Sequence, residues 1–372
     1  MSMTSEGRPA SVSYEVLTKL GQVAAIASSW DALLARSRCN RAYGSSKWYL
    51  ATVEMLPKLQ PLVFIAQRDH ILSGVLPLWL EAGRRLARFG DNYIEHLDII
   101  ASDEDSEVIA GLLDLALQET GSYDRLVLGS VKHDSNFVKG ARALGLRAVV
   151  DEFFVPGKSL TYAVLDLTRG YDQYMKTLSR NFRRNLHHRW NKAKKDGLIV
   201  RELTPADLEP ELLPKTLLSL HLSRFGERSD FKSAEPWIRK LFPSLFAEGR
   251  IRVFAILEKG RIAGIDLETV TRSGMYGYMG GFLPEIRRYA PGTLLIHKAI
   301  QQACLEGMAE YDLGWWGQDY KADWKPAVRE VGEPRLAVRS HRSTDSKEQQ
   351  EQQEQTLTQR TFKNASLGGW TD

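Results

Sequence analysis

The chain has 372 residues, of which 43% are hydrophobic and 26% charged, a composition typical of folded globular proteins. This excludes wholesale disorder, a collagen-like repeat and a membrane bundle, since no stretch approaches the roughly 18 apolar residues of a spanning helix. Fifty Lys and Arg against 46 Asp and Glu give a net charge of +4, too small to argue for or against nucleic acid.

A weak internal repeat organises the chain. When the sequence is laid over itself at a shift of about 190 residues, similar short patterns recur in unbroken order. Two similar lobes explain this order, and two unrelated α/β halves are the alternative. The matched positions are Leu17 with Leu203, Trp48 with Trp237, Val63 with Val253, Gly74 with Gly264, and Leu128 with Leu313.

The first half contains a predicted hairpin, with strands at 62–67 and 71–80 joined by a turn at 68–70. The second half repeats it with strands at 251–257 and 262–270 around a turn at 258–261. A third strand at 275–281, a helix from Gly292 to Gly307 and a buried strand at 310–316 complete this half. The fold class is therefore α/β (α+β), with mixed, mostly antiparallel sheets flanked by helices.

A long helix is predicted at 171–195, between the halves. Its apolar side chains recur every four residues, from Leu178 to Trp190, and its other faces are basic. The basic residues form either a solvated face or a surface for RNA or an anionic saccharide, against which Trp190, His187 and His188 would stack. We divide the chain into a first lobe (1–165), this connecting helix (166–197), a second lobe (198–342) and a Gln/Glu-rich disordered tail (343–372).

The segment 282–295 has the features of an anion site. Arg287 and Arg288 precede Gly292, where a helix is predicted to begin with unpaired N–H groups and the positive end of its dipole. An exposed Pro-Gly turn beside two surface arginines is the alternative. The matching place in the first half carries acids at 103–107, which would repel a phosphate.

The segment 311–324 is dense in aromatic, glycine and polar residues, as strand ends that line ligand sites often are. Asp312, Asp319, Tyr320 and Lys321 are expected to cluster near the start of the helix at Gly292. The alternative is that the tryptophans pack and Lys321 is a surface charge.

These segments resemble the GNAT-like acyltransferases of the CelD type, associated with cellulose or exopolysaccharide biosynthesis and related to the Fem-type transferases. The resemblance covers roughly residues 30–330 and implies tandem GNAT-like lobes. It also implies an acyl-CoA donor, such as acetyl-CoA, held by Arg287, Arg288, Gly292, Thr293 and Leu294. In contrast to the usual GNAT loop, Arg288 is followed by Tyr-Ala-Pro-Gly-Thr, which is one residue longer. The motifs are LSRNFRRNL at 178–186, PGTLL at 291–295, YDLG at 311–314, and Gly317, Tyr320, Lys321 and Trp324.

The resulting hypothesis is an N-acyltransferase in which an acceptor amine attacks the thioester directly. Glu268, Asp266 or Asp312 would act as the base and Tyr320 as the acid, while Lys321 would orient a carboxylate or phosphate on the acceptor. The acceptor is expected to be a small molecule or a polysaccharide-related component of the cell envelope. Two alternatives remain: a Fem-like transferase that uses aminoacyl-tRNA, and a non-catalytic scaffold for polysaccharide synthesis.

Two cysteines, Cys39 and Cys304, exclude a disulfide framework, and no Cys/His spacing fits a zinc site. The N-terminal residues are polar, without the apolar segment of a leader. We therefore expect a cytoplasmic protein with no metal cofactor and no membrane span. The acyl group, the acceptor and the oligomeric state are not predicted.

Overall fold

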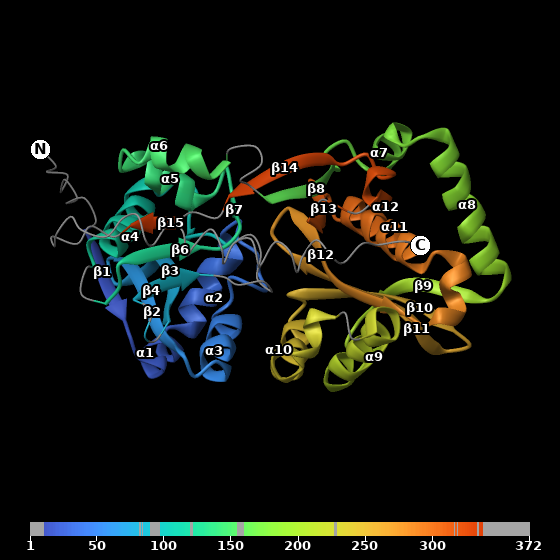
Figure 1. Cartoon of the computed structure of the whole chain (residues 1–372), viewed down its shortest axis with the longest axis horizontal. Helices are drawn as coiled ribbons and strands as arrows, with labels where there is room; N and C mark the ends of the chain where they lie inside the picture. Colours follow the sequence, from blue (N-terminus) through green and yellow to red (C-terminus); the bar gives the residue numbers. More distant parts are fainter. Residues whose placement is uncertain are drawn as a thin grey trace, which may run out of the picture.

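A computed structural model describes residues 11–337 except 82, 84, 90–96, 120–121, 155–159, 227–228, 316, 318 and 333–334. Two lobes lie side by side, and each contains a β-sheet flanked by helices (Figure 1). The predicted fold class, α/β with two helix-flanked sheets, is confirmed. The predicted disordered tail at 343–372 falls outside the described residues.

The first lobe is built on a seven-stranded sheet with the order β1-β2-β3-β4-β6-β15, in which β5 pairs with β3. Its hairpin, β2 and β3, has the predicted turn, where Asp69 and His70 adopt positive φ angles. Its elements are β1 (Val12–Leu17), α1 (Leu20–Ala25), α2 (Ala27–Arg36), α3 (Ser46–Met55), β2 (Leu59–Arg68), β3 (Ile71–Glu81), β4 (Leu86–Phe89), β5 (Ile100–Ala101), α4 (Ser106–Gln118), β6 (Arg125–Leu128), α5 (Asn136–Ala143), α6 (Arg147–Asp151), η1 (Glu152–Phe154) and β15 (Arg335–Ala337).

The second lobe is built on an eight-stranded sheet with the order β7-β14-β8-β13-β12-β11-β10-β9. One face of this sheet packs against α7, α8 and α11, and the other packs against α9 and α10. Its elements are β7 (Val131–Lys132), β8 (Leu160–Asp166), α7 (Tyr171–Thr177), α8 (Arg180–Lys195), β9 (Leu198–Leu203), η2 (Pro210–Leu212), α9 (Leu213–Phe225), η4 (Asp230–Lys232), α10 (Glu235–Ala247), β10 (Ile251–Glu258), β11 (Arg261–Val270), β12 (Gly274–Phe282), η5 (Pro284–Tyr289), α11 (Pro291–Leu305), β13 (Glu310–Trp315), α12 (Asp319–Ala322) and β14 (Ala327–Gly332).

The topology repeats between the lobes. The antiparallel run β1-β2-β3-β4 followed by parallel β6 corresponds to β9-β10-β11-β12 followed by parallel β13. The residues matched in the sequence occupy equivalent elements: Trp48 lies on α3 and Trp237 on α10, and Gly74 lies on β3 and Gly264 on β11. The two lobes therefore share one strand order.

The lobes exchange strands. The next strand in each sheet is antiparallel, but it comes from the opposite half of the chain: β15 joins β6, and β8 joins β13. The division predicted at residue 165 therefore lies at the end of a strand that belongs to the second sheet. Near the lobe interface, β14 pairs with both β8 and the short β7, which links the second sheet to the loop that precedes α5.

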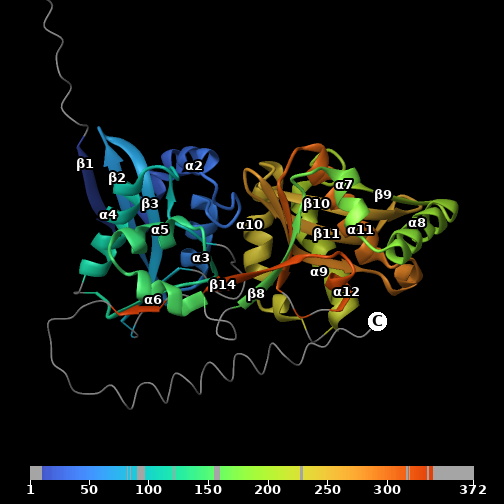
Figure 2. The same ribbon diagram turned by 90° about the horizontal axis from the view of Figure 1, so that it is seen from above.

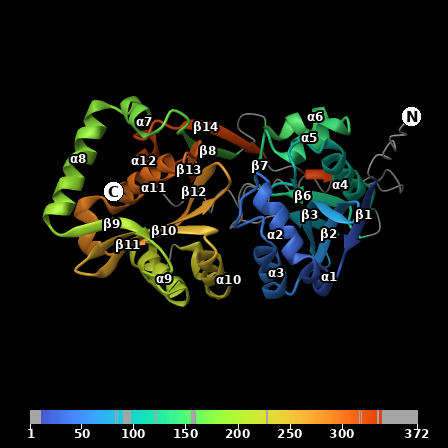
Figure 3. The same cartoon turned by 180° about the vertical axis from the view of Figure 1, so that it is seen from behind.

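The long helix predicted at 171–195 is two helices, α7 and α8. Leu178 is extended between them, and the Ser179 hydroxyl accepts from the N–H of Phe182, which caps a new helix. The basic helix also does not connect the lobes, because β8 before it and β9 after it both belong to the second sheet. All three views place α8 at the outer end of the second lobe, away from the first (Figures 1, 2 and 3).

The two lobes share one apolar core and several polar contacts. The rings of Trp48 and Trp237 meet edge to face with their centroids 4.5 Å apart. Arg250 forms a bidentate pair with Asp31, with N–O distances of 3.2 and 2.9 Å. These contacts fix the lobes against each other. Among the described residues, no helix is long and apolar enough to cross a membrane.

Candidate acyl-transfer site

A gap opens in the second sheet where β12 and β13 part. These parallel strands pair only between residues 274–276 and 310–312. Beyond that register β12 continues to Phe282 and remains paired with β11, whereas β13 is irregular between Asp312 and Trp315, with Gly314 at a φ of +79°. Past Tyr276, no strand of the described chain pairs with the β13-facing edge of β12. Its backbone groups can therefore bond an extended ligand.

The chain enters α11 directly after this gap. Ala290 adopts the left-handed conformation, with a φ of +53°, and Pro291 occupies the first turn of the helix. No side chain caps the helix, and a Cβ built on Gly292 would meet no atom within 4 Å. The start of α11 is thus an open, uncapped helix N-terminus, as the sequence predicts. Thr293 lies there as well, whereas Leu294 is buried in the core and offers only its backbone.

The two arginines predicted to bind the donor have different neighbours. Arg288 donates to the Tyr289 hydroxyl at 2.6 Å and lies 3.9 Å from an Asp196 carboxylate oxygen. Arg287 instead lies close enough to Arg224 to contribute to a lowered pKa of that guanidinium, the main cause of which is burial. A further cation comes from α8, since Arg189 donates to the Thr293 hydroxyl at 3.2 Å.

Two carboxyl groups lie on β11 on the same face of the sheet as α11. Burial raises the pKa of Asp266 to about 7, although Arg224 and the Leu267 N–H oppose the rise. Burial also raises the pKa of Glu268 well above its ordinary value, and the neighbouring Asp266 adds to this. Asp266 therefore titrates close to neutral pH, the range in which a general base is most effective.

Glu268 is fully buried at the start of the gap. Its Oε1 accepts from the Tyr311 hydroxyl at 2.8 Å, and its Oε2 has no hydrogen-bond partner among the described residues. A Cβ built on Gly277 would lie 3.5 Å from this Oε2 and 3.5 Å from the carbonyl oxygen of Asp312. Because Gly277 has no side chain, space remains between Oε2 of Glu268 and the point where β12 and β13 separate. A buried polar atom without a partner is costly, so a ligand donor or a water fits here.

Tyr320 and Arg224 belong to the same group of residues. Burial and the charges of Asp266 and Glu268 raise the pKa of Tyr320, while Arg224 opposes the rise, so the phenol keeps its proton at neutral pH. The Arg224 guanidinium lies over the ring of Phe282, 4.6 Å from its centroid. The sequence reasoning predicted Tyr320 and Glu268 but missed Arg224, because α9 carries no recognisable motif.

Asp312 lies apart from this group, whereas Lys321 lies beside it, with its Nζ 5.9 Å from the centroid of the Tyr320 ring. Side chains alternate along β13, so Asp312 is on the opposite face from Tyr311 and Glu268. Its Oδ1 accepts from the N–H of Gly314 at 2.8 Å, which stabilises the turn in the strand. Lys321 is only 3% exposed and donates to the Trp315 carbonyl at 2.6 Å, which ties α12 to the end of β13. Both residues have a structural role in these contacts.

The start of α4 in the first lobe is filled by the chain itself. The Asp105 side chain accepts from the N–H of Val108 and caps the helix. Arg68 in turn binds Asp105 and Glu107, each at 3.0 Å. The acids seen in the sequence therefore occupy the position that is left open at α11.

Comparison with known proteins identifies the second lobe. Residues 180–322 match the family model described as an acetyltransferase (GNAT) domain. No curated protein matches the chain. Among solved structures, FemX has a TM-score of 0.61 at 15% identity and covers 87% of this chain and 97% of its own. The C-terminal domain of a putative lysylphosphatidylglycerol synthetase from Agrobacterium fabrum has a TM-score of 0.52 at 12% identity, with 86% and 93% covered.

A tandem GNAT protein from the clavulanic acid biosynthesis pathway has a TM-score of 0.45 at 14% identity, with 89% of this chain and 100% of that chain covered. At these identities, the likenesses to FemX and to the synthetase domain show the fold alone. The family match spans α8 to α12 and thus includes the gap, the start of α11 and the carboxyl pair. Residues 180–322 of the second lobe thus match an acetyltransferase (GNAT) domain, which supports an acyltransferase, and such domains generally use acyl-CoA.

Proposed function

We propose that the second lobe transfers an acyl group from acyl-CoA to an amine by direct attack, without an acyl-enzyme intermediate. The observation that carries the proposal is the gap between β12 and β13, which opens beside two buried carboxyl groups and leads to the uncapped start of α11. Amines of small molecules, or of cell-envelope and polysaccharide precursors as in the CelD type, are the proposed acceptors. A cytoplasmic location is part of the same proposal.

The residues at the start of α11 fit a pyrophosphate. The N–H of Gly292 and the helix dipole favour negative charge, and the missing side chain lets a phosphate approach the backbone. Arg287 adds a guanidinium on the side of Arg224, and Arg189 fixes Thr293 at the same helix start. Acyl-CoA supplies the thioester, whose carbonyl carbon is the electrophile.

The side chains around the gap account for the proton transfers. Asp266 takes a proton from the acceptor ammonium, directly or through a water, because its pKa of about 7 lets it be ionised at neutral pH and still bind a proton. As the C–N bond forms and the C–S bond breaks, Tyr320 donates its phenolic proton to the departing sulfur, and the phenolate takes back the second proton that the bonded nitrogen loses, directly or through a water. The N–H groups along the unpaired edge of β12 stabilise the developing oxyanion.

Release of free thiol from acetyl-CoA in the presence of a panel of amines tests this function. Tyr320→Phe should reduce kcat at least about tenfold with the fold intact. Arg287→Ala should raise KM for acetyl-CoA about tenfold, whereas Arg288→Ala, whose guanidinium is engaged by Tyr289 and Asp196, should change it less than threefold. Unchanged kinetics in Tyr320→Phe and Arg287→Ala would contradict the proposed site.

A Fem-like transfer from aminoacyl-tRNA is a second candidate, favoured by the exposed cations of α8, which include Arg180, Arg184 and Lys194. Trp190 does not support it, because its Nε1 donates to the buried Nδ1 of His297 at 2.8 Å and the ring packs inward. Filter binding of tRNA at two salt concentrations separates the candidates. Tight binding that weakens by about 10³-fold between 50 and 200 mM salt supports the tRNA donor, and acetyl-CoA turnover without tRNA binding excludes it.

A further inference from the structure

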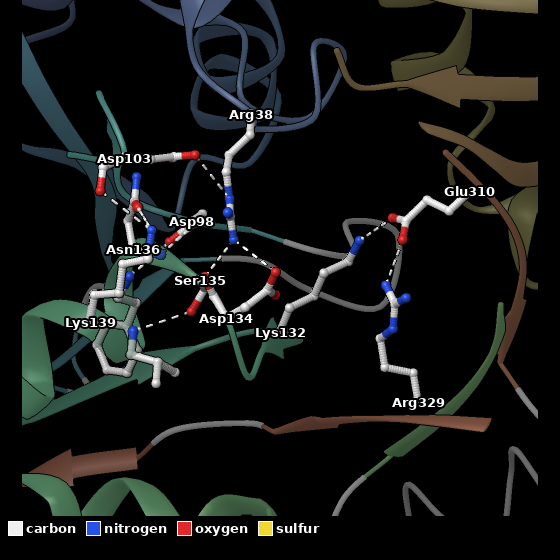
Figure 4. A network of polar contacts seen from close by, with 12 residues as sticks. Arg38, Asp98, Asp103, Lys132, Asp134, Ser135, Asn136, Lys139, Glu310 and Arg329 are labelled. Atoms are coloured by element: carbon white, nitrogen blue, oxygen red, sulfur yellow. Dashed lines mark hydrogen bonds and ion pairs between the residues drawn. The ribbon is translucent and has the colours of Figure 1, made fainter. Parts of the chain in front are cut away.

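A pocket of about 170 Å³ lies between the lobes, away from the acyl-transfer site. Residues of both lobes line it: Arg38, Asp98, Lys132 and Asp134 come from the first half of the chain, and Tyr276, Glu310 and Arg329 from the second. Figure 4 shows Lys132 and Arg329 converging on Glu310 across the interface, with Arg38 beside Asp134. The site described above does not use this pocket.

The position of the pocket separates it from the gap. Tyr276 and Glu310 lie where β12 and β13 are still paired, whereas the gap begins at Gly277. Glu310 is one residue from Tyr311, so its side chain is on the face of the sheet opposite Tyr311 and Glu268. Acyl transfer and the pocket therefore occupy different faces and different ends of the same two strands.

The carboxylates of the pocket already have donors from the chain. Glu310 accepts from Lys132 at 2.9 Å, from Tyr276 at 2.6 Å and from Arg329 at 2.7 Å. Burial opposes the ionisation of Glu310, but Lys132 and these hydrogen bonds outweigh it and lower its pKa to about 2. Asp98 accepts from the N–H groups of Asn136 and Phe137, each at 2.8 Å.

The cations of the pocket carry N–H groups that make no hydrogen bond to the described residues. Among the described residues, Lys132 donates two of its three N–H groups, to Tyr276 and Glu310, and Arg329 donates only through Nη1 to Glu310. Arg38 uses Nη2 for Asp134 and Nε for Asp103. The pocket therefore offers more free donors than free acceptors, a pattern that favours an anionic ligand group.

The volume of the pocket and the charges that line it limit the class of ligand that can bind. A volume of about 170 Å³ is below the roughly 300 Å³ at which sites for drug-sized ligands begin, so a nucleotide does not fit. The lining contains three cations and three carboxylates, and Asp103 and Asp312 also act on these cations, so the pocket lacks the surplus positive charge that a phosphate dianion needs. Ser135, Thr271 and Ser273 add hydroxyl groups for a polar body.

We propose that this pocket binds a small polar molecule with one carboxylate, of the size of a hydroxy acid or an amino acid, through the free donors of Lys132 and Arg329. Such a ligand contacts both lobes at once and stabilises their packing. The proposal goes beyond acyl transfer, because the pocket shares no residue with the acyl-transfer site.

Isothermal titration of the full chain with L-lactate and with L-serine tests the proposal. At least one should bind to the wild-type protein, and Arg329→Gln should weaken that binding at least tenfold. Arg85→Gln is the matched control, since Arg85 pairs with Asp124 outside the pocket, and it should leave binding unchanged. Ser273→Leu fills the pocket and leaves the ion pairs intact, so it should also weaken binding of the acid. This second variant tests the proposal if Arg329→Gln does not fold.

Inorganic phosphate and acetyl-CoA complete the experiment. Phosphate should bind more weakly than the carboxylate that binds, and acetyl-CoA affinity should be the same in Arg329→Gln as in the wild type. Three results would overturn the proposal: no heat with either acid, binding as tight as in the wild type in both Arg329→Gln and Ser273→Leu, or tighter binding of phosphate than of the acid. Binding of an acid by a protein that does not bind acetyl-CoA would leave the pocket standing and count against the acyl-transfer function alone.

Discussion

At the scale of single residues, the environment of two carboxyl groups sets the chemistry. Asp266 and Glu268 are both buried on β11, and burial raises the pKa of each. Arg224 opposes the rise at Asp266, and Tyr311 and Arg252 oppose it at Glu268. The pKa of Glu268 is raised well above its ordinary value, and its Oε1 accepts a hydrogen bond from the Tyr311 hydroxyl. Two carboxyl groups with raised pKa values thus lie two residues apart on one strand, and Asp266 is the proposed base.

The pH dependence of Asp266→Asn tests this assignment. In the wild type, kcat/KM should rise with pH and level off above about pH 7, because Asp266 must be ionised to accept a proton. Asp266→Asn should lose at least about 10²-fold in kcat/KM and no longer show that rise, whereas Glu268→Gln should keep it. A rise near pH 7 that persists in Asp266→Asn would show that another group is the base.

Asp266→Asn should also raise the free energy of unfolding at neutral and alkaline pH. The raised pKa means that the folded state keeps a proton that the unfolded state releases above about pH 4. The free energy of unfolding of the wild type therefore falls as pH rises from about 4 to 7. Above pH 7 the buried Asp266 is ionised, and this loss of stability is complete. Thermal unfolding should show Asp266→Asn more stable than wild type at pH 8 and nearly equal at pH 4.

The sequence predicts some of these residues and not others. Alternation in the hairpin places Asp266 and Glu268 on one strand, and the loop after β13 draws attention to Tyr320. The same loop suggests Asp312 and Lys321: Asp312 bonds to the local backbone at Gly314, and Lys321 bonds to the Trp315 carbonyl and also lies over the Tyr320 ring. These partners are local, but the burial of both side chains depends on tertiary packing, which the loop's composition does not encode.

At the scale of elements, glycines mark where helices approach strands closely. A Cβ on Gly74 of β3 would lie 2.4 Å from Val108 and 2.7 Å from Leu112 of α4. Gly264, at the repeated position on β11, would bring a Cβ to 3.2 Å from Ile286. The repeat seen in the sequence at this position therefore has a packing cause in both lobes.

Gly74→Ala should destabilise the protein by about 1–3 kcal/mol, because α4 must move away from the sheet. Gly21→Ala is the matched control: a Cβ there meets nothing within 4 Å, and alanine favours the helix α1. Urea denaturation followed by circular dichroism measures both variants. Equal stability of the two would show that α4 does not pack on Gly74 as described.

The sequence predicts the positions of the strands better than the boundaries of the helices. The four-residue spacing from Leu178 to Trp190 continues through Ser179, so the periodicity alone predicts one helix. Ser179 instead caps α8 with its hydroxyl, and Leu178 becomes extended. Capping of this kind depends on one residue's backbone conformation, which an apolar pattern does not report.

At the scale of the whole molecule, strand exchange makes the lobes interdependent. β8 lies between β13 and β14 in the second sheet, although it precedes α7 and α8 in the chain. No sequence pattern marks this exchange, because the strands that swap are short and far from their partners along the chain. The repeat predicted two lobes but not which half supplies each strand.

A fragment of residues 198–337 should therefore fail to fold, since β13 and β14 lose the strand between them. A fragment of residues 160–337, which restores β8, should show more native-like circular dichroism than the shorter fragment, although it still lacks the first lobe's part of the shared core. Cooperative unfolding of the shorter fragment would contradict the role of β8.

The central claim is that the donor binds in the second lobe, at the parting of β12 and β13 and the start of α11. Amide hydrogen exchange with and without acetyl-CoA measures this directly, because binding slows exchange where the backbone is engaged. The account predicts protection at residues 277–294 and none at residues 103–108, where Asp105 caps α4. Protection of the first-lobe helix start with none at 277–294, or no protection in either lobe, would contradict it.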